Sequence, residues 1–252
     1  MKWLDKLGKD RRGSRPRCVL LTEGDPATVS VRLTDLIGRP DVVISPDDVW
    51  QPNGKASVRE AQLDKALEGG RTLLDERTRQ ELRDWWLATN TSRARTPNWD
   101  IASTCTISGK RGMLLVEAKA HEGELSSDDR CGATGANRVR IERALAEATT
   151  DLRRATGETW QLSPNHHYQL SNRFAWSWKL ASLGVPVVLL YLGFLNAREM
   201  PEPRLYSEPG WRTVLADHCR GVVDETCWES TLDVHGVQLL PMARVFEQPF
   251  GG

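Results

Sequence analysis

Three charged residues in the middle of the chain have the types and spacing of a hydrolytic metal site. Asp100 begins one strand-like run, and Glu117 and Lys119 stand two residues apart near the end of the next. Residues i and i+2 of a strand project to the same face, so Glu117 and Lys119 are expected to point together. Two carboxylates suit a hard divalent cation, and a lysine beside them can orient an attacking water.

The elements around these residues predict that they meet. The runs at 99–107 and 112–120 are joined by Ser-Gly-Lys-Arg, which is a hairpin-type connection. The start of the first strand of a hairpin lies beside the end of the second, so Asp100 should lie near Glu117 and Lys119. The alternative is an unrelated α/β protein in which these charges are ordinary cross-strand pairs. That alternative predicts a solvated Glu117 far from Asp100.

The segment TPNWDIASTCTISGKRGMLLVEAKA resembles the PD-(D/E)XK nuclease superfamily. Asp100 matches the aspartate of that motif, and Glu117, Ala118 and Lys119 match its (D/E)XK tripeptide. The resemblance implies that Asp100, Glu117 and the Ala118 carbonyl hold Mg²⁺, for which Mn²⁺ can substitute. It implies that Lys119 positions the hydrolytic water and offsets the charge that develops on the phosphate.

The same resemblance implies an α/β fold with a restriction-endonuclease-like mixed central sheet flanked by helices. Such nucleases place an acidic helix before the hairpin, then a helix and a buried strand after it, which fits residues 71–200 as the core. Residues 1–70 are then an N-terminal extension packed on the core, and residues 201–252 a C-terminal helix-strand extension. Trp99 before the aspartate and an extra helix near 137–155 depart from the pattern without touching the metal ligands.

Two helices are expected to add side chains to this site. The helix before the hairpin normally supplies a glutamate ligand, and Glu81 borders its apolar face whereas Glu76 points nearly opposite. In a later helix Gln169 and Arg173 are four residues apart and share a face, so both can lean over the metal. We expect Gln169 to act in catalysis and Arg173 to hold the substrate phosphate. The alternatives are a surface ion pair between Glu81 and Arg77, and polar residues that cap the rim of the later helix.

Hydrophobic periodicity predicts the remaining elements. Five basic side chains between residues 9 and 17 suggest a solvated arm before a first short strand that starts at Cys18. The predicted helices lie at 26–37, 73–89, 137–155, 164–182 and 211–223, and further strands at 41–45, 185–195 and 232–240. The run at 185–195 is apolar without alternation, as expected of a strand buried on both faces.

Composition bounds the class of protein and its partners. The 252 residues are 39% hydrophobic and 27% charged, which excludes disordered, collagenous and membrane classes. Thirty-four basic residues balance thirty-four acidic ones, so contact with nucleic acid must use local patches. The basic candidates around the hairpin and beyond it are Arg93, Arg95, Lys110, Arg111, Arg138, Arg140 and Arg143.

The cysteines and the chain's apolar segments predict a cytoplasmic location. Five cysteines without a CxxC pair favour reduced thiols over disulfides or a zinc site. No apolar run precedes the N-terminal charges, and the longest apolar run is too short to span a bilayer. We therefore expect a cytoplasmic, metal-dependent nuclease that acts on nucleic acid, DNA in preference to RNA, without a membrane partner. A homodimer is left open, and the alternative function is a non-catalytic nucleic-acid-binding or assembly module that retains the nuclease fold.

Overall fold

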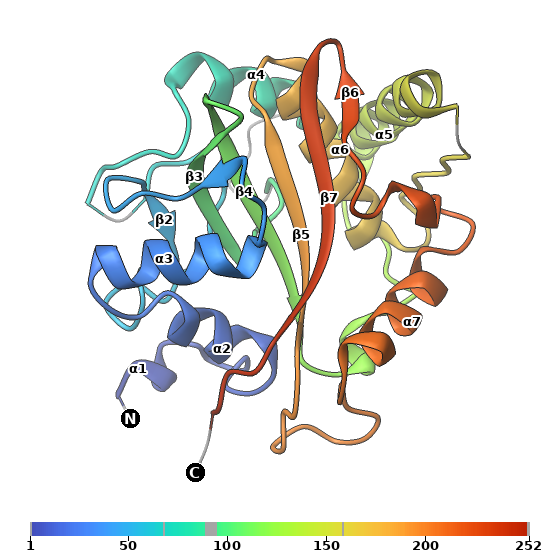
Figure 1. The fold of residues 1–252 in the computed structure, drawn as a ribbon. Helices are drawn as coiled ribbons and strands as arrows, with labels where there is room; N and C mark the ends of the chain where they lie inside the picture. The colour runs from blue at the N-terminus through green and yellow to red at the C-terminus, as the bar shows by residue number, and fades with distance from the viewer. Residues whose placement is uncertain (1, 68, 89–94, 158, 251–252) are drawn as a thin grey trace.

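The computed structural model describes residues 2–67, 69–88, 95–157 and 159–250. These residues form a curled mixed sheet with helices on both faces (Figure 1). The seven described α-helices are α1 (Lys2–Asp5), α2 (Ser14–Leu21), α3 (Pro26–Ile37), α4 (Glu76–Trp86), α5 (Gly135–Thr156), α6 (Tyr168–Ser182) and α7 (Glu208–Cys219). The strands are β1 (Val42–Val43), β2 (Trp50–Gln51), β3 (Ile101–Ile107), β4 (Lys110–Lys119), β5 (Val187–Phe194), β6 (Leu232–Val234) and β7 (Val237–Phe246). Two 3₁₀ turns, η1 (Glu122–Glu124) and η2 (Glu225–Cys227), complete the regular elements of this part of the chain.

The sheet is built around the predicted hairpin. Its strand order is β1-β3-β4-β5-β7-β6, and β2 pairs with β3 off this path. β3 and β4 run antiparallel, with Ile101 opposite Val116 and Ile107 opposite Lys110. β5 then joins parallel to β4, and β7 parallel to β5 along eight register positions. One sheet therefore takes strands from both ends of the chain as well as from its middle.

The two faces of the sheet bury two separate apolar cores. Alternating residues of β4, such as Leu114 and Val116, pack with α2 and α3 on one face. The intervening residues, such as Met113 and Leu115, pack with α4, α5, α6 and α7 on the other. β5 is buried along its whole length, as its unalternating sequence predicts.

Two of the predicted strands are wrong. The apolar run that starts at Cys18 belongs to α2, since a short buried run has no period that separates helix from strand. The predicted strand at 232–240 is a hairpin, because His235 and Gly236 take left-handed backbone angles, φ 55° and 81°, and turn the chain between β6 and β7.

The basic segment before α2 is not a wholly solvated arm. Arg17 is 1% exposed and donates through Nη2 to Glu199 Oε2 at 2.8 Å. Arg15 pairs with Glu60 at 2.8 Å and keeps 13% of its side chain exposed. This segment is therefore part of the folded molecule.

The five predicted helices are confirmed as α3, α4, α5, α6 and α7, and the ends of the last four differ from the predicted ones by up to four residues. α3 follows Asp25, whose side chain accepts the Thr28 N–H at 3.0 Å, and stops at Gly38 with φ 66°. The five cysteines are all buried thiols. No helix in the described ranges is long and apolar enough to cross a membrane.

Candidate active site

The hairpin brings the three sequence-predicted residues together at one end of the sheet. Asp100 directly precedes β3, and its Oδ2 accepts the backbone N–H of Ala118 at 2.8 Å. Glu117 is 1% exposed and Lys119 5% exposed, so both charges lie beneath the surface. The alternative of ordinary cross-strand pairs predicts a solvated Glu117 far from Asp100. The structure has a buried Glu117 at the strand end where Asp100 lies.

Helix α6 completes a buried charge network around Glu117. Lys119 Nζ donates to Glu117 Oε1 at 2.5 Å and to Gln169 Oε1 at 2.7 Å. Arg173 Nε donates to the other oxygen, Glu117 Oε2, at 2.6 Å. The spacing of four residues on α6 therefore turns Gln169 and Arg173 toward the strand end, as predicted. Each oxygen of Glu117 faces a cation.

Further contacts fix the Arg173 side chain and the backbone of Gln169. Arg173 Nη1 donates to Asn172 Oδ1 at 2.6 Å, and the guanidinium lies 4.6 Å from the centre of the Trp99 ring. The first turn of α6 is held by Asp129, whose Oδ2 accepts the Gln169 N–H at 2.5 Å. The site thus rests on a strand end and an anchored helix start, which are rigid supports.

The network gives the two carboxylates opposite pKa shifts. Burial, and then the charge of Glu117, raises the pKa of Asp100 to about 7. Burial also acts to raise the pKa of Glu117, but Arg173 and Lys119 outweigh it and hold that pKa below its usual value. Burial opposes the charge of Lys119, yet Glu117 and Asp100 keep its pKa above the usual value. Asp100 is therefore the carboxylate whose charged form its surroundings disfavour.

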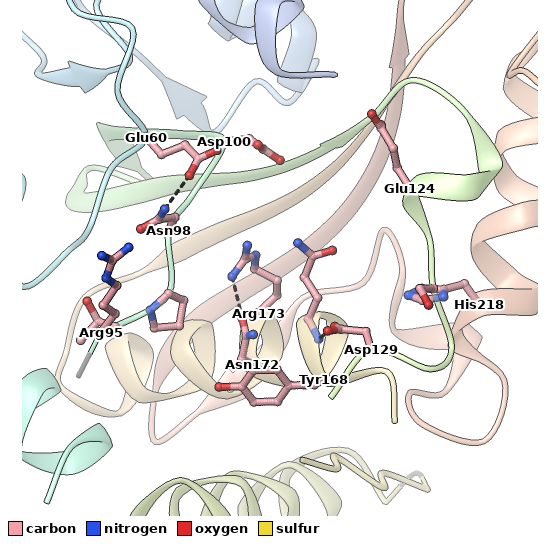
Figure 2. A pocket seen from close by; sticks show the side chains of 14 residues that line it. Glu60, Arg95, Asn98, Asp100, Glu124, Asp129, Tyr168, Asn172, Arg173 and His218 are labelled. Atoms are coloured by element: carbon pink, nitrogen blue, oxygen red, sulfur yellow. Dashed lines mark hydrogen bonds between the residues drawn. The ribbon is translucent and has the colours of Figure 1, made fainter. Parts of the chain in front are cut away.

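A cavity of about 580 Å³ opens over this group. Figure 2 shows Glu60, Asn98 and Arg95 along one wall and Glu124 and His218 on the other, with Arg173 between them. Asp100 and Gln169 also line it. The cavity therefore reaches Asp100, Gln169 and Arg173, whereas Glu117 and Lys119 do not line it.

Three acidic residues that line this cavity, Glu60, Glu124 and Asp129, were not predicted from the sequence. Glu60 comes from the loop between β2 and α4, where it accepts from Asn98 Nδ2 at 2.6 Å. Glu124 lies in η1, and its Oε2 accepts the Ala120 N–H at 2.6 Å. Glu124 follows Lys119 by five residues, which is at most a weak signal. Glu60 lies in a stretch without periodicity and gave no signal.

The structure does not bring Glu81 to this cavity. Its carboxylate accepts from Arg77 Nε at 2.8 Å on the outer side of α4, and its side chain is 39% exposed. Leu82 and Trp86 take the buried face of α4, so Glu81 turns outward. The surface ion pair weighed as the alternative is the observed arrangement.

The predicted basic residues divide between near and distant positions. Arg95 lines the cavity, and Arg93 lies outside the described residues. Lys110 and Arg111 lie at the opposite end of the hairpin, six and five register positions from the Ile101–Val116 pair, which is about 17 to 20 Å along the strands. These two do not belong to the site.

The α5 arginines of the prediction do not line this cavity either. Arg138 pairs with Glu142 at 2.7 Å and donates to Asn165 Oδ1 at 2.5 Å. Arg143 is exposed and Arg140 half-buried on the same helix.

The oxygen groups that the sequence assigns to a divalent cation are the carboxylates of Asp100 and Glu117 and the carbonyl of Ala118, which are hard ligands. Burial and the charge of Glu117 raise the pKa of Asp100, so a cation beside it would favour its charged form. Glu117 would have to release one of its present partners. Within the described ranges no group of three or more His, Cys, Asp or Glu side chains is placed to hold a metal ion.

Comparisons with known proteins add no identity to this site. The chain matches no model of a protein family, no curated protein and no solved structure.

Proposed function

We propose that this protein is a metal-dependent phosphodiesterase that hydrolyses nucleic acid, DNA in preference to RNA. The observation that carries the proposal is the meeting of Asp100, Glu117 and Lys119 at one strand end, where Glu117 and Lys119 are buried and the half-buried Asp100 lines an open cavity. Burying charge costs free energy, and a carboxylate such as Asp100, which lines a cavity beside a buried charge network and has a raised pKa, is typical of catalytic sites.

The order of elements supports a restriction-endonuclease-like fold for this chemistry. α4 precedes the β3–β4 hairpin, α5 and α6 follow it, and the buried strand β5 joins parallel to β4. This is the order that the sequence resemblance implies for PD-(D/E)XK nucleases. α5 takes the place of the inserted helix.

The proposed mechanism gives each side chain a separate task. Asp100, Glu117 and the Ala118 carbonyl would hold Mg²⁺, which when bound polarises a phosphate oxygen and makes a bound water more acidic. Lys119 has three N–H donors, and two go to Glu117 and Gln169. Its third donor would orient the attacking water and stabilise negative charge in the transition state.

Arg173 would exchange one anion for another during binding. Its guanidinium now neutralises Glu117 Oε2 and is held flat by Trp99 and Asn172. A substrate phosphate entering the cavity would offer it a second acceptor of the planar, bidentate kind that guanidinium prefers. The transfer of Arg173 to phosphate would free a Glu117 oxygen for the metal, so substrate and metal would bind cooperatively.

The test is incubation of the wild-type protein with labelled single- and double-stranded DNA and RNA, in Mg²⁺, Mn²⁺ or EDTA. We expect cleavage that requires divalent ion and that Asp100→Asn abolishes. Cleavage in EDTA that Asp100→Asn leaves unchanged, or no cleavage of any of the four substrates, would overturn the proposal.

The second candidate is a non-catalytic nucleic-acid-binding module on the same fold. The observation that favours it is that Lys119 and Arg173 already neutralise both oxygens of Glu117, which leaves the site balanced without metal. Calorimetric titration with MnCl₂ separates the two. Oligonucleotide binding without any heat of metal binding would favour the module.

A further inference from the structure

A second cavity, of about 570 Å³, adjoins the first. The two share Glu60, Arg95 and Asn98, so the wall labelled with these residues in Figure 2 stands between them. The remaining lining of the second cavity is Arg15, Arg59, Gln62 and Lys65. Arg59, Gln62 and Lys65 belong to the loop between β2 and α4, for which the sequence predicts no role.

The second cavity carries a local excess of positive charge. Four of its seven lining residues are cationic and one, Glu60, is anionic. Glu60 is already engaged by Arg15 at 2.8 Å and by Asn98 at 2.6 Å. Arg59, Lys65 and Arg95 are exposed. Since the whole chain has a net charge of zero, this excess is a property of the cavity and not of the protein surface in general.

Hydrogen bonds fix the loop that carries these cations in register with the catalytic strand. The backbone of Ala61 pairs with that of Trp99 in both directions, at 3.2 and 2.9 Å, and Trp99 is the residue before Asp100. Gln62 Nε2 donates to the Thr96 carbonyl at 3.0 Å, and Gln51 Nε2 donates to the Arg59 carbonyl at 2.7 Å. The spacing between the cationic cavity and Asp100 is therefore set by the backbone.

We propose that the second cavity is a binding subsite for backbone phosphates of the same nucleic-acid strand that is cut at Asp100 and Lys119. The strand would leave the first cavity past Asn98 and Arg95 and continue to Arg59 and Lys65. This inference rests on the proposed function, and it adds the path of the substrate. Contacts of this kind fix the register of a strand and carry no sequence information.

Charge reversal at the far end of this path tests the subsite without touching the catalytic residues. The variant is Arg59→Glu/Lys65→Glu. The matched control is Arg154→Glu/Arg220→Glu, which makes the same change in net charge at side chains that are 75% and 79% exposed and line neither cavity. Circular dichroism melts of both variants check that each is folded.

Binding is measured first, in EDTA, by fluorescence anisotropy with single-stranded DNA and RNA of about 20 nucleotides and mixed sequence. We expect the Arg59→Glu/Lys65→Glu variant to bind at least tenfold more weakly than the control. Its log-log salt slope should also be smaller by about 1.4, which is about 0.7 for each of two phosphates on a single strand. All sequences should be affected alike.

Turnover in Mg²⁺ then places the subsite relative to the chemistry. Because Arg59 and Lys65 would contact substrate in the ground state and the transition state equally, their reversal should raise KM and leave kcat unchanged. Binding equal to that of the control would overturn the subsite, and divalent-dependent cleavage by the same wild type would show that the proposed function stands. Oligonucleotide binding that depends on Arg59 and Lys65, without cleavage in any metal, would support the phosphate subsite and overturn the nuclease activity. Absence of any salt-dependent binding by the wild type would overturn both.

Discussion

Two aspartates lie against the same hairpin, and their surroundings differ. Asp48 has 1% of its side chain exposed, and its carboxylate has three partners. Its Oδ2 accepts the Ser45 N–H at 2.8 Å. Its Oδ1 accepts the Thr104 hydroxyl at 2.8 Å and pairs with Arg111. Asp100 accepts a single hydrogen bond from the described residues, the N–H of Ala118, and lines a cavity. The acceptors of Asp48 serve the fold, whereas Asp100 has acceptor capacity left for a ligand.

The arginines at the two ends of the hairpin differ in the same way. Arg111 pairs with Asp48 from a side chain that is 61% exposed, so water competes for its charge. Arg173 pairs with Glu117 from a side chain that is 6% exposed, where an unpaired charge would be costly. An ion pair at the hairpin turn is thus replaceable, whereas the network at the strand end is not.

The largest expected effect on this difference between the two ends of the hairpin is the loss of stability in Glu117→Ala. The substitution leaves Lys119 and Arg173 buried without their shared partner, which typically costs about 3 to 5 kcal/mol. Arg111→Ala at the other end should cost about 1 kcal/mol or less. Urea unfolding of both variants measures the difference, and equal losses would contradict a buried network.

The pH dependence of the same variant has a defined sign. The pKa of Glu117 is lowered by Arg173 and Lys119 in the folded state, so its stabilising contribution is present above its unfolded pKa and lost as pH falls through the folded pKa. The difference in unfolding free energy between wild type and Glu117→Ala should therefore shrink on acidification.

The next effect in size is on turnover in Lys119→Ala. Lys119 is assigned to the water and the transition state, and the carboxylates to the metal, so cleavage should fall about a hundredfold or more while divalent binding persists. Lys110→Ala, at the other end of the same strand, is the control and should keep wild-type turnover. Equal loss of Mn²⁺ affinity and of activity in Lys119→Ala would count against the role of Lys119.

A smaller effect distinguishes the two aspartates directly. Asp100→Asn should stabilise the metal-free protein at pH 7 by about 0.5 to 2 kcal/mol, because it removes a charge that burial and Glu117 disfavour. Asp48→Asn should destabilise it by about 1 to 3 kcal/mol, because it weakens a satisfied set of hydrogen bonds. Thermal melts in EDTA decide, and the same sign for both would remove the contrast.

The pH dependence of Asp100→Asn follows from the raised pKa of Asp100. Its folded pKa of about 7 lies above its unfolded value, so wild type is stabilised by this group at low pH and loses that contribution as pH rises through about 7. The advantage of Asp100→Asn should therefore be larger at pH 8 than at pH 4. An advantage independent of pH would point to packing instead of charge.

Local patterns in the sequence were sufficient for the hairpin and the residues at its end. The predicted hairpin is confirmed, but its connection is only Ser108 and Gly109, because Lys110 and Arg111 pair with Ile107 and Thr106 within β4. The hairpin itself is enough to bring Asp100 to the end of β4 that carries Glu117 and Lys119. The period of α6 likewise turns Gln169 and Arg173 toward them. These contacts follow from short-range geometry and need no knowledge of the tertiary fold.

Contacts made by irregular segments could not be predicted from the sequence. Glu60, Arg59 and Lys65 lie in a loop that reaches the site only through hydrogen bonds to residues 96–99, and such bonds leave no periodic signal. The prediction that Glu81 is a metal ligand was wrong for a related reason. Glu81 borders the apolar stripe of α4, and the packing of that helix decides which border of the stripe faces the sheet. The predicted strand at Cys18 was wrong because an apolar run as short as that of α2 fits a helix and a strand equally well.

The smallest expected effect is the response of the folded state to metal. A ligand that binds only the folded protein stabilises it by mass action, by about 1.4 kcal/mol at ten times its Kd. For a chain of this length that gain corresponds to about 3 to 6 °C in Tm. Wild type and Asp48→Asn should both gain this on addition of Mg²⁺ or Mn²⁺, since Asp48 lies away from the proposed ligands, whereas Asp100→Asn should not. If Asp100→Asn and wild type gain equally in Mn²⁺, and Asp100→Asn melts lower than wild type in EDTA, then both aspartates are structural and the metal site is wrong.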